Sequence, residues 1–241
     1  MKKLAFWSPW IRKWRSSWCE DISTPGNRFC AYFDMVILDH AYTRYLYPNS
    51  AWISDHVFRQ NHPPPMMVKR AANQGIQTIV NFRGTNDFGS NLLSEEACEK
   101  YGLNLVYFRA LSRAAPKKEM LRDALELFEN LEYPALFHCK SGADRAGLMS
   151  ALYLLIHLKR PIEEAQKELS WKFGHFRSAK TGILDFFFDT YAEAQQKTGI
   201  DFMQWVESEY DPIELTRQFQ SRPSKGKNAA NFIIDRILHR E

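Results

Sequence analysis

Cys139 and Arg145 are the residues of this sequence best suited to carry out chemistry, and five residues separate them. A short apolar run precedes His138, and a longer apolar run begins at Ala146. This order predicts a strand, a loop and a helix. Gly142 can adopt the positive φ that a tight loop needs, so that backbone N–H groups turn inward beside the helix N-terminus. Such a loop forms a site for an anion of the size of phosphate.

The two flanking side chains suit this anion site. Its positive potential favours the thiolate form of a cysteine at its floor, and the thiolate is the nucleophilic form. The planar guanidinium of Arg145 can bind two phosphate oxygens at once. A buried structural cysteine beside a solvated arginine is the alternative, but it leaves Gly142 and Gly147 unexplained.

The stretch reads His-Cys, five residues and then Arg-Ala-Gly, and it resembles the active-site loop of the cysteine-dependent phosphatases. This superfamily includes protein tyrosine, dual-specificity and phosphoinositide phosphatases. The resemblance implies that Cys139 is the nucleophile of a phosphomonoester hydrolase that works through a phosphocysteine intermediate, without metal or cofactor. The phosphate-binding residues that it implies are Lys140, Ser141, Gly142, Ala143, Asp144 and Arg145. The loop departs from the family at Ala146, where a Ser or Thr usually hydrogen-bonds the cysteine sulfur and assists breakdown of the intermediate.

The leaving oxygen also needs a proton. The family commonly places an aspartate some way before the cysteine, but residues 106–116 contain no carboxylate here. By resemblance to myotubularins and Sac-type phosphatases, Asp144 is the first candidate for the proton donor, and Asp87 is the second. A carboxyl group beside a phosphate dianion keeps its proton to higher pH, which suits this role. The alternative for Asp144 is an ion pair that positions Arg145 or a basic residue of the loop.

A β-α alternation from residue 51 onward is expected to position the loop. The expected strands are 52–58, 76–82, 103–108 and 135–137, and the expected helices are 66–74, 94–101, 117–131, 146–158, 161–169 and 184–194. The pattern predicts an α/β fold with a mainly parallel sheet flanked by helices, and it resembles bacterial dual-specificity-like phosphatases over residues 51–195. Arg83 and Asp87 follow the strand 76–82, at the sheet edge where such folds bind ligands.

The expected organisation has three parts: an N-terminal extension (residues 1–50), a catalytic domain (51–195) and a C-terminal helical extension or tail (196–241). Residues 1–18 contain five basic residues, four tryptophans and no acid. A helix with Ser8 as N-cap and Pro9 in its first turn would align Trp10, Trp14 and Trp18. These indoles could lie on an anionic membrane surface or pack on the protein itself. The aromatic residues from 29 to 47 are expected to pack under the catalytic domain, and no chemistry is assigned to Asp34, Asp39 or His40.

The substrate remains open between a phosphoprotein and a phospholipid or inositol phosphate. Lys140 after the cysteine resembles the loop of phosphoinositide phosphatases. Four basic residues in one connection could bind a second anionic group or form a solvated turn: Lys172, His175, Arg177 and Lys180. A module that binds phosphate groups without hydrolysing them is a further alternative, although the presence of both Cys139 and Arg145 argues against it.

Composition restricts the remaining possibilities. A net charge of +4 and a pI near 8.8 suit phosphorylated substrates or an anionic membrane, but they fall short of a nucleic-acid-binding arm. The four cysteines have no metal-ligand spacing, which excludes a zinc motif and favours a reducing cytoplasm. The longest apolar run, 146–158, is too short to span a bilayer. We expect a cytoplasmic protein, with possible peripheral contact to the inner membrane face through residues 1–18, and the oligomeric state is not indicated.

Overall fold

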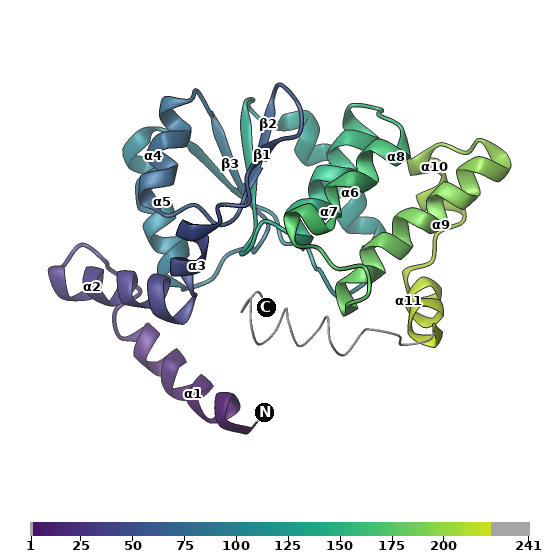
Figure 1. Ribbon diagram of the computed structural model, residues 1–241. Helices are drawn as coiled ribbons and strands as arrows, with labels where there is room; N and C mark the ends of the chain where they lie inside the picture. Colours follow the sequence, from purple (N-terminus) through teal and green to yellow (C-terminus); the bar gives the residue numbers. More distant parts are fainter. Residues whose placement is uncertain (1, 223–241) are drawn as a thin grey trace.

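The computed structural model describes the backbone of residues 2–222 and the side chains of residues 9–222. At its centre is a sheet with the strand order β1-β2-β5-β3-β4, in which all neighbours are parallel except β1 and β2 (Figure 1). The strands are β1 (Ala51–Trp52), β2 (Val57–Gln60), β3 (Thr78–Asn81), β4 (Asn104–Tyr107) and β5 (Ala135–His138). The predicted α/β fold with a mainly parallel sheet is confirmed.

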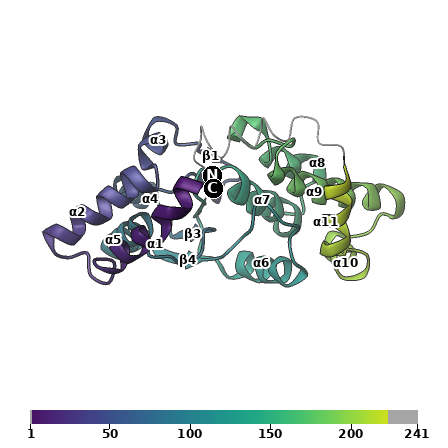
Figure 2. The ribbon, with the colours of Figure 1, turned by 90° about the horizontal axis from the view of Figure 1, so that it is seen from below.

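Helices cover both faces of the sheet. Figures 1 and 2 place α1–α5 on one side of it and α6–α11 on the other. The helices that flank it are α4 (Pro65–Asn73), α5 (Gly89–Tyr101), α6 (Lys118–Asn130) and α7 (Asp144–Leu152). Alternate side chains of β3 face the two layers, because Ile79 packs in the cluster of α4 and α5 and Val80 in that of α6 and α7. The strands are apolar because both faces are buried.

The central strands bring two loops together. β3 and β5 are parallel neighbours, and Asn81 at the end of β3 is paired with His138 at the end of β5. The segments that follow, 82–88 and 139–143, therefore leave the sheet side by side at its carboxyl edge. This is the edge at which the sequence predicts the ligand site.

The second layer continues past α7 through short helices and ends in three longer ones. The short helices are η2 (Tyr153–His157), α8 (Ile162–Ala165), η3 (Gln166–Glu168), η4 (Trp171–Phe173) and η5 (Lys180–Gly182). The last helices are α9 (Ile183–Thr198), α10 (Phe202–Ser208) and α11 (Pro212–Ser221). The predicted domain boundary at residue 195 falls inside α9. Phe187, Trp205 and Leu215, one from each of these three helices, belong to the main core. Residues 223–241 of the predicted C-terminal extension or tail lie outside the described residues.

The N-terminal extension consists of α1 (Lys2–Ser16), α2 (Pro25–Phe33), η1 (Asp34–Leu38) and α3 (Ala41–Leu46). The prediction that Ser8 caps its first helix is wrong, because α1 begins at Lys2 and contains Pro9. Trp14 and Trp18 contact each other edge to face and pack in a small core with Met35. Trp10 is 61% exposed. Two of the three aligned indoles thus pack on the protein itself.

Two elements differ from the prediction, one because of hydrogen bonds in a turn and one because of helix packing. The expected strand 52–58 is a hairpin of β1 and β2, because the Ser54 hydroxyl accepts hydrogen bonds from the N–H groups of the turn. The fifth helix begins at Gly89, five residues before Ser94. The Gly89 N–H donates to Asp34, and a Cβ at Gly89 would lie 2.1 Å from the Ala31 carbonyl oxygen, so contact with α2 sets this start. Among the helices of residues 2–222, none has the length and apolar character of a membrane-spanning segment.

Candidate active site

The predicted phosphate loop connects β5 to α7. Cys139 follows the last residue of the strand and is 2% exposed, and α7 begins at Asp144. Gly142 has a φ of +75°, and a Cβ at this position would lie 2.7 Å from the backbone nitrogen of Asn61. Only glycine satisfies both the backbone conformation and the close approach of the chain after β2.

The carbonyl groups of the loop are held on its outer side. The carbonyl oxygen of Lys140 accepts a hydrogen bond from the His62 N–H at 3.1 Å, and that of Ser141 accepts one from the Asn49 side chain at 2.8 Å. The next carbonyl oxygen, of Gly142, accepts a bond of 2.6 Å from the Arg59 guanidinium. Within a trans peptide unit the C=O and the following N–H point in opposite directions. The N–H groups of residues 141–143 are therefore turned to the inside of the loop, as an anion cradle requires.

Arg59 supports this loop from below, a role that the sequence analysis did not assign. It comes from β2 and is fully buried. Its guanidinium also donates to the carbonyl oxygens of Ala143 (3.2 Å) and Glu168 (2.9 Å), forms an ion pair with the Glu168 carboxylate, and lies 3.9 Å from the centre of the Phe173 ring. The available signal was an arginine inside an otherwise buried strand, which needs partners for its charge.

Beside the loop lies a cavity of about 370 Å³ that is lined by cationic side chains. Its lining residues are Arg83, Thr85, Asn86, Phe88, Arg109, Lys140 and Arg145. Four of these are basic and none is acidic. Arg109 and Arg145 form no ion pair with any side chain between residues 9 and 222. The cavity is suited to an anionic ligand, and the fold brings together the predicted residues Arg83, Lys140 and Arg145.

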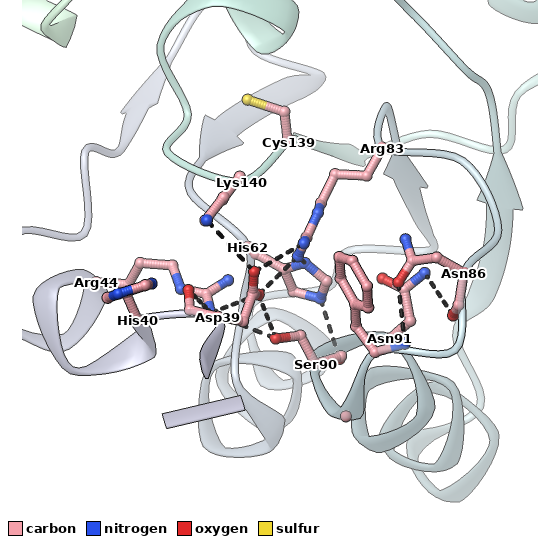
Figure 3. Close-up of polar contacts among 12 residues, drawn as sticks. Asp39, His40, Arg44, His62, Arg83, Asn86, Ser90, Asn91, Cys139 and Lys140 are labelled. Atoms are coloured by element: carbon pink, nitrogen blue, oxygen red, sulfur yellow. Dashed lines mark hydrogen bonds and ion pairs between the residues drawn. The ribbon is translucent and has the colours of Figure 1, made fainter. Parts of the chain in front are cut away.

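A buried carboxylate, Asp39, lies at the centre of a basic cluster next to this cavity (Figure 3). Its two oxygens each accept a hydrogen bond of 2.8 Å from Arg83, and one also accepts a bond of 2.9 Å from Arg44. The ammonium of Lys140 lies 3.6 Å away. Burial alone would raise the pKa of Asp39, but Arg83, Arg44 and Lys140 together hold it well below its usual value. Asp39 is therefore ionised and was missed because its partners are distant in sequence.

Two neutral histidines connect this cluster to the strand before Cys139. The His62 Nδ1 lies 2.8 Å from Arg83, and the His62 ring lies 4.5 Å from the ring of His138, measured between centres. Burial lowers the pKa of His138 to about 3 and that of His62 well below its ordinary value. Because both rings are neutral near pH 7, the Nδ1 of His62 can accept its hydrogen bond from Arg83.

At the other end of the loop, His175 is buried between two carboxylates. Its Nδ1 lies 2.7 Å from Asp144, and its Nε2 lies 2.6 Å from Asp185. Burial would lower the pKa of His175, but the hydrogen bonds to Asp144 and Asp185 outweigh it and raise the pKa to about 9. The expectation that His175 contacts the substrate does not fit this structure, because the side chain is buried and both nitrogens are occupied.

The other predicted site residues lie outside the cation-lined cavity. Arg177 pairs with Asp189 and lines a separate cavity of about 660 Å³. Lys180, in η5, is exposed and does not line the cavity beside the loop. Neither predicted proton donor lines it, since Asp144 is buried against His175 and Asp87 is exposed on the loop after β3. The fold therefore gathers the phosphate-binding residues but leaves the proton donor unassigned.

Residues 90–158 match the family model described as "Tyrosine phosphatase family". The matched segment begins in α5 and ends just after η2, so it contains both Cys139 and Arg145. Over these residues the match bears out the predicted resemblance to the tyrosine phosphatase superfamily, and it supports the predicted enzyme class, a phosphoric monoester hydrolase.

Among solved structures, this chain is similar to TpbA of P. aeruginosa, with 17% identity, a TM-score of 0.46 and coverage of 72% of this chain and 91% of TpbA. It is also similar to the core catalytic domain of the PP-IP phosphatase SIW14 from S. cerevisiae, with 15% identity, a TM-score of 0.47 and coverage of 63% and 93%. A putative phosphatase from Shewanella putrefaciens is similar with 16% identity, a TM-score of 0.47 and coverage of 65% of this chain and 97% of that protein. No curated protein matches the sequence. These likenesses are too remote to assign a substrate.

Because His175 is buried between two carboxylates, we expect the stability of the protein to decrease at alkaline pH. Its pKa is about 9 in the folded state and about 6.5 in an unfolded chain, so the folded state binds the proton more tightly. The contribution is complete below about pH 6.5, decreases as pH rises, and is lost above about pH 9, a change on the order of 3 kcal/mol. We expect the free energy of unfolding, measured by urea titration, to fall across this range.

The His175→Gln variant should lose this pH dependence, while His56→Gln, at an exposed histidine, should keep it. An unchanged slope in His175→Gln would show that another group titrates.

Proposed function

We propose that the protein hydrolyses phosphomonoesters through a phosphocysteine intermediate, as a phosphatase of the protein tyrosine/dual-specificity type. The observation that carries this proposal is the loop between Cys139 and Arg145, whose carbonyls are bonded from outside so that its N–H groups face inward. This arrangement supports a site in which Cys139 is the nucleophile, the loop N–H groups bind the phosphate and Arg145 supplies the guanidinium.

In the proposed reaction the Cys139 Sγ forms a bond to phosphorus while the bond to the ester oxygen breaks and that oxygen takes up a proton. Water then attacks the phosphorus of the phosphocysteine, which releases inorganic phosphate and restores the thiolate. The loop N–H groups and Arg145 stabilise the equatorial oxygens in both steps. Ala146 is fully buried and offers no hydroxyl to the sulfur, so the second step proceeds without that help.

The nucleophile is tested by the Cys139→Ser variant. The hydroxyl of serine ionises far less readily than a thiol, so we expect Cys139→Ser to abolish release of nitrophenol from p-nitrophenyl phosphate. The parent protein should be active in the presence of EDTA and inhibited by vanadate. Cys98→Ser, which alters a cysteine buried in α5, is the matched control and should stay active. Metal-dependent activity that survives in Cys139→Ser would contradict the proposal.

The role of Asp144 is tested by its dependence on the leaving group. The hydrogen bond that Asp144 accepts from His175 supports a structural ion-pair role for this carboxylate rather than that of proton donor. We therefore expect Asp144→Asn to lower turnover of p-nitrophenyl phosphate and of phenyl phosphate by a similar factor, about tenfold. Nitrophenolate leaves without a proton, so a loss confined to phenyl phosphate would instead identify Asp144 as the proton donor. Asp87→Asn is the parallel variant on the neighbouring loop.

A second candidate function is favoured by the cation-lined cavity: hydrolysis of a phospholipid or inositol phosphate at a membrane surface. Four basic side chains beside the cradle provide more positive charge than one phosphate group needs. For membrane contact through residues 1–18, the described side chains supply exposed Trp10, Arg12 and Lys13, while Trp14 and Trp18 pack internally. Phe29 and Leu46 in the same extension are 70% and 86% exposed.

The two candidates are separated by substrate and by vesicle binding. If the lipid candidate holds, phosphoinositides and phosphatidylglycerophosphate are turned over more efficiently than phosphotyrosyl peptides. The protein should then co-sediment with vesicles that contain phosphatidylglycerol and much less with neutral vesicles. A Trp10→Ser/Leu46→Ser variant should bind these vesicles less tightly, whereas Trp171→Ser, at an 84% exposed tryptophan of η4, is the control. Peptide turnover without vesicle binding would support the protein phosphatase.

A further inference from the structure

We propose that Asp39, which the N-terminal extension supplies, is a positioning residue that aims Arg83 and Lys140 at an anionic group of the substrate. This inference rests on the proposed function, because it assumes that the cation-lined cavity receives the phosphorylated substrate. It adds the N-terminal extension to the active site. Asp39 itself does not line the cavity and acts through the two basic side chains.

The contacts of Arg83 leave its guanidinium little freedom. Both terminal nitrogens bind Asp39, one oxygen each, and one of them also binds the neutral ring of His62 (Figure 3). A bidentate pair of this kind fixes the plane of the guanidinium as well as its position. Arg83 is only 5% exposed and still lines the cavity. Asp39 thereby determines which edge of the guanidinium is left for a ligand.

Asp39 is itself held by three elements. Asp39 follows η1 directly, and its N–H donates to the carbonyl oxygen of Asp34 at the start of that helix. The next residue, His40, has a φ of +58° that turns the chain into α3. From α3, Arg44 returns to bind the carboxylate at 2.9 Å, and from α5 the Ser90 hydroxyl donates to it at 2.5 Å. A carboxylate bound in this way is a fixed reference point for Arg83 and Lys140 rather than a flexible surface acid.

Charge makes the role of Asp39 testable, because two effects of its removal have opposite signs. Asp39 is the shared counter-ion of Arg44, Arg83 and Lys140. If it only balanced charge, its loss would make the cavity more positive and would tighten anion binding. If it positions the cations, its loss lets them repel one another and move, and anion binding weakens despite the added positive charge.

The test uses the full chain with the Cys139→Ser substitution, so that binding is measured without turnover. We expect Asp39→Asn to weaken the binding of inorganic pyrophosphate in calorimetry by about tenfold, and that of inorganic phosphate by less. The matched control is Glu96→Gln in α5, which removes the carboxylate that pairs with Arg28 of α2 and adds the same charge. Neither Glu96 nor Arg28 lines the cavity, so pyrophosphate affinity should not fall.

Arg83→Gln completes a double-mutant cycle. If Asp39 acts through Arg83, the two substitutions together should cost clearly less than the sum of their separate effects. Pyrophosphate binding that is unchanged or tighter in Asp39→Asn overturns the proposal, as does an equal loss in Glu96→Gln. If thermal unfolding shows that Asp39→Asn does not fold, Arg83→Gln and Lys140→Gln carry the test, and unchanged pyrophosphate affinity in both overturns the proposal. Because binding is measured in a variant without the thiol, failure of the phosphocysteine mechanism would be seen separately.

Discussion

The site depends on hydrogen bonds that hold the carbonyl groups of the catalytic loop on its outer side. Without such donors, a loop of this length would satisfy its carbonyls elsewhere and would not keep its N–H groups free for an anion. Arg59 binds two of these loop carbonyls, those of Gly142 and Ala143. It also binds the carbonyl of Glu168, which lies outside the loop. Removing one partner of a buried ion pair typically costs about 3–5 kcal/mol. Loss of the Glu168 carboxylate would therefore destabilise Arg59 and, through it, the loop that Arg59 holds.

The N-terminal extension is a structural part of the site. A Cβ at Gly89 would meet the Ala31 carbonyl oxygen, so α2 can approach α5 only because position 89 carries no side chain. Asp34 then receives the Gly89 N–H, and η1 continues from there to Asp39. One chain of contacts thus connects a helix packing interface with the carboxylate that binds Arg83. For this reason the extension and the loop after β3 have to be considered together.

The sequence predicted those features whose determinants are close together along the chain. The strand, loop and helix around Cys139 and Arg145 are encoded within a few residues, and buried strands such as 78–81 are recognisable because both faces are apolar. What it did not predict depends on distant partners. Arg59 binds a carbonyl 83 positions away, and Asp39 binds Arg83 across 44 positions.

His175 is a residue whose environment was predicted wrongly from its neighbours in the sequence. It lies among basic residues, a pattern that suggests a solvated or substrate-binding turn. In the fold it meets Asp144, 31 positions before it, and Asp185, 10 positions after it, and these two carboxylates allow its burial. Local charge therefore gave a poor indication of its environment, because the decisive charges come from α7 and α9.

The buried clusters around Asp39 and His175 carry opposite net charges at the two ends of the loop. At its start, Lys140 belongs to a group in which three cations surround the single carboxylate of Asp39, so that the cluster is positive overall. At its end, Asp144 belongs to a group in which one imidazolium lies between two carboxylates. The positive cluster adjoins the cavity, and the negative one is buried among α7, α9 and the segment between them. The positive potential is therefore highest at the start of the loop, where Cys139 lies, while the carboxylate of Asp144 is paired with His175. The loop can carry an aspartate next to Arg145 without cancelling this positive potential.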